Sequence, residues 1–180
     1  LLSMPLDTEV GLIEIGTNSF GEIAFLCALL QPNYGLITNI GKEHLEGFGD
    51  LEGVAREESE LFHYLLKNQG FAFVNHDDVY LGRMSHRLPN KRTYSTQSDK
   101  ADTVARPSQV APELVIPFQD KTLRSKLSGV HNAQNIAATV AIAVELEVSL
   151  HDIEQGIQSY QPTNNRSEIK TIGTNNFLLD

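Results

Sequence analysis

The chain has 180 residues and a formal net charge of −9, from 14 basic and 23 acidic residues. This length is enough for one main domain with its own core. The acidic excess, without a basic block, argues against nucleic acid as the principal partner. It does not exclude a phosphorylated ligand, because bound divalent cations can reverse the local electrostatic field that the side chains produce.

The chain carries no sign of a membrane or secreted protein. No apolar stretch approaches the roughly 20 residues of a membrane span, and the opening LLSMPLDTE has no signal-peptide pattern. The single cysteine, Cys27, sits in the apolar run AFLCALL, which favours a buried, inert thiol and excludes a disulfide framework. We therefore expect a cytoplasmic protein with no membrane partner. Because LLSMPL reads like the tail of an upstream segment, we also expect a fragment.

Strands and helices alternate in the first half of the chain. The runs VGLIEI, GLITNI and FAFVN are apolar and bounded by glycine or polar residues, and helical segments separate them. The predicted strands are Val10–Ile15, Gly35–Ile40 and Phe71–Asn75; the predicted helices are Phe20–Leu30, Leu51–Asn68 and about 77–87, the last capped by Asp77. Apolar strands covered by helices predict an α/β fold with a mostly parallel sheet.

The second half is more mixed. Between Lys91 and Leu127 the runs KRTYST, ELVIPF and KTLRSKL predict a small antiparallel β patch or a loop-rich flap. Helices are predicted at Asn132–Glu147 and at Ser149–Tyr160, the second capped by Ser149 and Asp152. QPTNN is a linker by composition, and the last residues alternate like a hairpin. We divide the chain into a main domain, residues 1–160, and a linker with the first strands of another domain, residues 161–180.

Polar residues follow two predicted strands at the edge where ligands bind in open α/β sheets. Glu14 lies near the end of the first strand, Asn39 near the end of the second, and His44 in the loop after it. A carboxylate and an imidazole at one edge suit a divalent cation. The alternative is structural, with Glu14 paired to a lysine and His44 capping a loop. The spacing alone does not decide between them.

A second group of candidates lies at a predicted helix start. His131, Asn132 and Asn135 stand where free backbone N–H groups and side-chain amides can hold a polar ring or an anion. An N-cap role for Asn132 is an equally good interpretation of this position. Arg166, just after the linker, is placed to reach a phosphate, although a lone surface arginine is common.

Five segments, taken together, resemble the Mur ligase family. They follow the family's order and span nearly the whole chain, and HLEGFG after a strand-terminal asparagine is the most specific part. The segments are EIGTNSFGEI at Glu14–Ile23, TNIGKEHLEGFG at Thr38–Gly49, VNHDD at Val74–Asp78, GVHNAQNIAA at Gly129–Ala138 and NRSE at Asn165–Glu168. The resemblance implies the central ATP-binding domain of a three-domain enzyme, truncated at its N-terminus.

The resemblance also implies an activity. Such enzymes phosphorylate a substrate carboxylate with ATP and Mg²⁺, and an amine then attacks the acyl phosphate to give an amide. The members that this chain resembles most add D-alanyl-D-alanine to UDP-muramoyl tripeptide in peptidoglycan synthesis. Carried over by position, Glu14 and His44 would bind magnesium, and Asn18 and Asn39 would lie near the substrate or the metal. The adenine side of the nucleotide would be held by His131, Asn132 and Asn135. Arg166 would approach the phosphates and Asp180 the ribose.

The chain departs from the family in two places. The phosphate-binding pattern G-x-x-G-K-[ST] is absent from the 180 residues, so we expect the chain to begin downstream of it and to be inactive alone. The family usually has a carbamylated lysine, whose carboxylate meets magnesium, where this chain has Glu58. Glu58 is thus a candidate catalytic metal ligand alongside His44; the alternative is a solvated helix face carrying Glu57, Glu58 and Glu60.

Three readings of function stay open. The first is the D-alanyl-D-alanine-adding ligase. The second is another Mur-type ligase, of the folylpolyglutamate synthase kind or specific for a different amino acid. The third is a non-catalytic nucleotide-binding module, which the missing phosphate loop and Glu58 would suit. In every case a sheet shortened by truncation would expose an edge, so self-association is expected.

Overall fold

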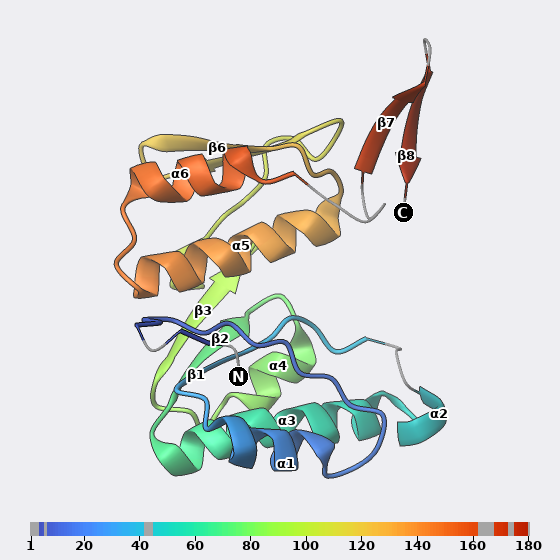
Figure 1. The fold of residues 1–180 in the computed structure, drawn as a ribbon, viewed down its shortest axis with the longest axis vertical. Helices are drawn as coiled ribbons and strands as arrows, with labels where there is room; N and C mark the ends of the chain where they lie inside the picture. Colours follow the sequence, from blue (N-terminus) through green and yellow to red (C-terminus); the bar gives the residue numbers. More distant parts are fainter. Residues whose placement is uncertain (1–3, 6, 42–44, 162–167, 173–174, 180) are drawn as a thin grey trace.

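A four-stranded parallel sheet forms the centre of the computed structural model, which describes residues 4–5, 7–41, 45–161, 168–172 and 175–179 (Figure 1). The strands, in the order in which they pair, are β1 (Tyr34–Ile37), β2 (Phe71–Asn75), β3 (Lys91–Ser95) and β4 (Thr103–Val104). The predicted strands at β1 and β2 are confirmed. The run KRTYST, expected in an antiparallel patch or flap, instead forms β3 of the parallel sheet. Its Tyr94 is buried in the core there, which stabilises this pairing.

Helices cover both faces of this sheet (Figure 1). On one face lie α1 (Glu22–Leu30), α3 (Leu51–Asn68) and α4 (Val79–Met84), with α2 (Leu45–Phe48) leading into α3. On the other lies α5 (Val130–Glu145), whose buried alanines allow close packing. Successive residues of β2 serve the two cores, Ala72 and Val74 facing α3 while Phe73 faces α5. This is the predicted α/β architecture.

A smaller layer follows the sheet. Strands β5 (Leu114–Phe118) and β6 (Lys121–Ser125) form an antiparallel hairpin, which confirms the predicted antiparallel patch for two of its three runs. Helix α6 (Leu150–Ser159) packs on β6, and the Ser149 hydroxyl accepts from the Asp152 N–H as predicted. The strands β7 (Glu168–Ile172) and β8 (Asn175–Leu179) confirm the predicted terminal hairpin.

The predicted strand at Val10–Ile15 is wrong. These residues form neither strand nor helix, and Leu12 is 96% exposed. A strand needs a pairing partner to satisfy its backbone groups, and no strand in the described part of the chain pairs with this run. Gly11 also weakens the strand propensity of the run.

The predicted cap of helix α4 is also wrong. Asp78, rather than Asp77, caps α4, and its carboxylate accepts from the N–H groups of Tyr80 and Leu81. The Asp77 carboxylate reaches Ser95 and Thr96 at the end of β3 instead. A capping carboxylate must stand directly before the first helical turn, and the turn in this chain begins one residue later than expected.

The expectation that Cys27 is buried is confirmed. Cys27 is fully buried on α1, and burial raises the pKa of its thiol, which keeps it in the unreactive protonated form. No helix in the described ranges is long and apolar enough to cross a bilayer.

The Asp102 carboxylate links β3 to the residues before β4 and gives the fold a pH dependence. The Thr93 hydroxyl and N–H donate to it at 2.6 and 2.7 Å, and these bonds lower its pKa. The stabilisation is present above the ordinary aspartate pKa of about 4 and is lost as pH falls through the lowered pKa of the folded state. We expect Asp102→Asn to flatten the loss of urea resistance between neutral pH and about pH 3; parallel profiles would contradict this.

Candidate functional site

The segments singled out in the sequence converge at the carboxyl ends of β1 and β2. Asn39 is exposed two residues beyond the end of β1, and the Ile40 N–H donates to the Asp78 carboxylate at 3.1 Å. Asp78 therefore has two tasks, capping α4 and holding the chain that leaves β1. The expected edge of the sheet thus gathers the residues that follow β1, up to position 41, and the segment at 74–78.

A compact turn at Thr17–Phe20 precedes α1. The Glu22 carboxylate accepts from the N–H groups of Asn18 and Ser19, at 2.7 and 3.1 Å, and from the Thr17 hydroxyl at 3.0 Å. The bonds from Asn18, then Ser19, then Thr17 hold the pKa of Glu22 below its usual range. The turn is thereby fixed, while the Asn18 side chain stays exposed.

Two of the motif segments touch directly. A Cβ atom on Gly47 would lie 2.4 Å from the Asn18 carbonyl oxygen, so only glycine permits the observed contact. The rings of Phe20 and Phe48 meet edge to face with centroids 5.0 Å apart. The turn that follows Glu14 in the sequence therefore packs against helix α2, which follows position 44.

The predicted metal ligands are only partly within the described residues. Glu14 is exposed in an irregular segment and makes no ion pair with a described residue. Glu58 is half-buried on α3 and has an interaction of its own. His44 lies outside the described residues, and so do Arg166 and Asp180. Within the described ranges no three His, Cys, Asp or Glu side chains form a metal-binding group. The magnesium set thus stays a prediction.

The acidic helix α3 is not the solvated face that was the alternative. Glu57 is only 2% exposed, and its carboxylate accepts from the N–H groups of Gly21 and Ile23, both at 2.8 Å. Glu60 is part-exposed and lies 3.3 Å from His63. The three glutamates therefore have different environments, and the burial of Glu57 was missed in the sequence. Its spacing from Val54 and Leu61 on the apolar stripe was the available signal.

The second candidate group lies on the opposite face of the sheet, at the start of α5. The N-cap is Gly129, so the interpretation of Asn132 as the N-cap is wrong. Asn132 lies within the first turn, where its buried amide donates to the Ser128 carbonyl at 2.7 Å. His131 and Asn135 are exposed. Asn132 thus has a fixed orientation at a helix start that carries no side-chain cap.

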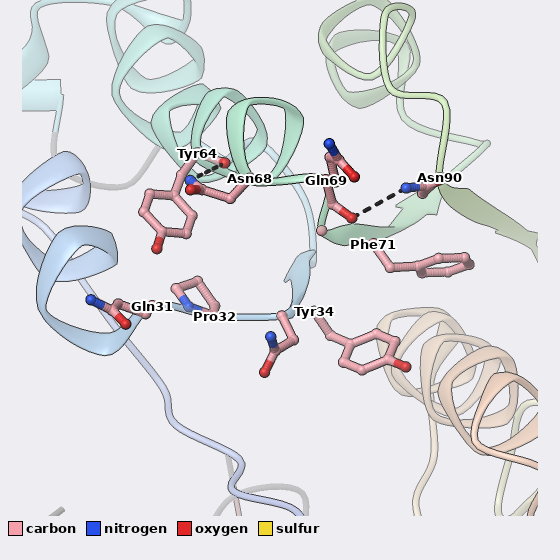
Figure 2. A pocket seen from close by; sticks show the side chains of 10 residues that line it. Gln31, Pro32, Tyr34, Tyr64, Asn68, Gln69, Phe71 and Asn90 are labelled. Carbon is pink, nitrogen blue, oxygen red and sulfur yellow. Dashed lines mark hydrogen bonds between the residues drawn. The ribbon is translucent and has the colours of Figure 1, made fainter.

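One cavity lies away from all these residues. Figure 2 shows it beside Tyr34, Tyr64 and Phe71, at the amino ends of β1 and β2, where its volume is about 440 Å³. Carboxamides supply most of its polar lining, and two of them are already used in bonds to the backbone carbonyls of Tyr64 and Gln69. No predicted site residue lines it. In parallel sheets ligands bind at the opposite edge, so we place the candidate site there.

This arrangement agrees with the comparisons. Residues 1–143 match the family model for the Mur ligase middle domain, and the chain belongs to the Mur ligase family. Among its relatives is the UDP-N-acetylmuramoyl-tripeptide--D-alanyl-D-alanine ligase of Treponema pallidum (strain Nichols), 31% identical over 179 residues, which cover 96% of this chain and 37% of the relative. The enzyme of the same name from Haemophilus influenzae is 30% identical over 183 residues, covering 100% of this chain and 40% of the relative.

A solved structure shows the same likeness. The crystal structure of MurF from Acinetobacter baumannii superposes with a TM-score of 0.79 at 29% identity, covering 93% of this chain and 38% of that one. The chain therefore spans less than half the length of these relatives. The resemblance inferred from the five motifs is confirmed at the level of family and fold.

Proposed function

We propose that this chain is the central part of an ATP-dependent ligase that adds D-alanyl-D-alanine to UDP-N-acetylmuramoyl tripeptide in the cytoplasm. The names of the relatives support this substrate pair. The observation that carries the proposal is the packing of Asn18 against Gly47, because it brings the segment that follows Glu14 against helix α2, which follows position 44 in the sequence.

The proposed residues divide the chemistry between them. Glu14, His44 and Glu58 would hold Mg²⁺, a set of oxygen and nitrogen donors that suits this ion. The exposed carboxylate of Glu14, next to the packed turn, fits this role. Magnesium, when bound, neutralises phosphate charge as the phosphoryl group moves to the substrate carboxylate. The residues proposed to contact nucleotide are His131, Asn132, Asn135, Arg166 and Asp180, and those proposed near substrate are Asn18 and Asn39.

The proposal also assigns parts of the chain. Residues 1–160 belong to the central domain, and residues 161–180 are a linker with the first strands of the next domain. The 180 residues hold no G-x-x-G-K-[ST] pattern, so we expect them to lack turnover by themselves, since the lysine and N–H groups of that loop hold the phosphates. The outer edge of β1, which pairs with no strand among the residues that the structure describes, supports self-association of the isolated chain.

The test is phosphate release from ATP by the complete protein that contains these residues. UDP-muramoyl tripeptide is supplied with and without D-alanyl-D-alanine, and the 180-residue chain serves as a control. Release that requires both substrates, with none from the control, is the expected result. Release with glutamate and a folate, or with another amino acid, would move the assignment to a different ligase of the family. ATP binding without release under any condition would favour a non-catalytic module.

A further inference from the structure

The carboxylate of Glu57 is buried against neutral donors from another part of the chain. One oxygen accepts from the Gly21 N–H and the other from the Ile23 N–H, both at 2.8 Å, with the Thr17 hydroxyl 3.4 Å away. Burying a carboxylate is costly unless hydrogen bonds replace its water. Here each oxygen has a backbone donor, so the burial is compensated only while α3 and the start of α1 keep this arrangement.

Glu57 acts as a cap for α1 supplied from a distance of 34 residues along the chain. The N-cap of α1 is Gly21, which has a left-handed backbone and offers no side chain to the first turn. The free N–H groups of a helix start carry a partial positive charge that a carboxylate stabilises. The Glu57 side chain therefore ties the first turn of α1 to the middle of α3.

The neighbouring residue on α3 holds the same turn from the side. The Arg56 guanidinium lies over the Phe20 ring, 5.9 Å from its centroid, and Phe20 in turn meets Phe48. Asn18, also in this turn, presents its carbonyl to Gly47. A continuous set of contacts thus runs from Glu57 through the Thr17–Phe20 turn to α2.

We propose that Glu57 is a positioning residue that sets the Thr17–Phe20 turn against α2, and through that contact the two segments that carry the metal-binding candidates. The role in catalysis rests on the proposed ligase function, whereas the positioning itself does not. The proposed role of Glu57 involves no contact with substrate or metal. It fixes where Asn18 stands and how closely the residues after position 44 approach it.

The test compares Glu57→Gln with Ser149→Ala in the complete protein. Glutamine keeps the size of the side chain but turns an amide N–H₂ toward a backbone N–H, so one of the two bonds fails. Ser149→Ala removes a cap from α6 and serves as a control for simple loss of stability. We expect amide hydrogen exchange in residues 17–23 to speed up about tenfold for the lost charged bond. Exchange in residues 45–49 should speed up as well, and Ser149→Ala should change neither.

Kinetics supply the second readout. Both variants are assayed at a temperature where they are folded. We expect the magnesium concentration for half-maximal phosphate release to rise about tenfold in Glu57→Gln, because loss of residues that orient metal ligands typically weakens metal binding by at least this factor. Ser149→Ala should leave it unchanged. If Glu57→Gln does not fold, Thr17→Val removes the shared hydroxyl and is measured in its place.

The two readouts separate the two proposals. Unchanged exchange in residues 45–49 would overturn the positioning role, whatever the assay of phosphate release gives. Coupled exchange in a protein that releases no phosphate would uphold the positioning and reject the ligase. Equal magnesium dependence in Glu57→Gln and Ser149→Ala, in an active enzyme, would overturn the catalytic consequence of the positioning.

Discussion

Glu58→Gln in the complete protein is expected to raise the magnesium requirement for phosphate release by about tenfold or more. A neutral amide is a poorer ligand for a hard cation than a carboxylate. The adjacent Glu57 fixes how α3 is rotated, through its bonds to Gly21 and Ile23. Glu58 therefore stands about 100° further round the helix axis, where it is half-buried.

Two further variants make this prediction specific. Glu60→Gln removes the same charge from the same helix, beside His63, and should leave the magnesium requirement unchanged. Glu58→Lys introduces the lysine that the resemblance to the family implies at this position, and we expect it to be active only where bicarbonate allows carbamylation. An unchanged magnesium requirement in Glu58→Gln would show that Glu58 is not a ligand.

Gly47→Ala is expected to weaken both the fold and the activity of the complete protein. The added Cβ would lie 2.4 Å from the Asn18 carbonyl oxygen, a backbone atom that the bonds to Glu22 hold in place. Overpacking of this kind costs about 1–3 kcal/mol. The separation it forces would also move the Asn18 turn away from α2, so phosphate release should fall further than stability alone explains.

Gly82→Ala is the matched control. Gly82 also lies in a short helix, α4, but a Cβ atom there would meet nothing within 4 Å. Alanine in a helix interior is about 0.5–1 kcal/mol better than glycine, so this variant should be at least as stable as the parent protein. Urea unfolding and phosphate release measure both variants. A Gly47→Ala protein with the stability of Gly82→Ala would contradict the close contact.

Much of the fold could be predicted from local pattern. Helix α3 has the predicted bounds because its apolar stripe is long and Gln69 and Gly70 follow it, and β2 has them because FAFVN lies between glycine and a polar turn. The run at Val10–Ile15 misled because strand formation depends on a partner as well as on composition. The strand at β3 was predicted but assigned to the antiparallel patch, because polar Lys91 and Arg92 at its start do not show that Tyr94 and Ser95 are buried in the parallel sheet.

The site was predictable in outline only. The rule that ligands lie beyond the carboxyl ends of strands placed Asn39 at this edge, and the neighbouring Ile40 donates to Asp78, which follows β2, as that placement requires. The contact between Asn18 and Gly47 depends on how α1 and α2 pack on α3, which no local spacing encodes. Glu57 was taken for a surface residue because charged side chains are rarely buried.

The buried carboxylate of Glu57 also decides which helix can attract an anion. The start of α1 already holds the negative charges of Glu22 and Glu57, so a phosphate approaching it meets repulsion where a bare helix start would draw it in. The start of α5 carries no side-chain cap and no acidic residue in its first turn. The electrostatic potential at the two helix starts therefore differs. An anionic ligand is repelled at the start of α1 and attracted at the start of α5, and this preference acts at long range, before the ligand contacts any side chain.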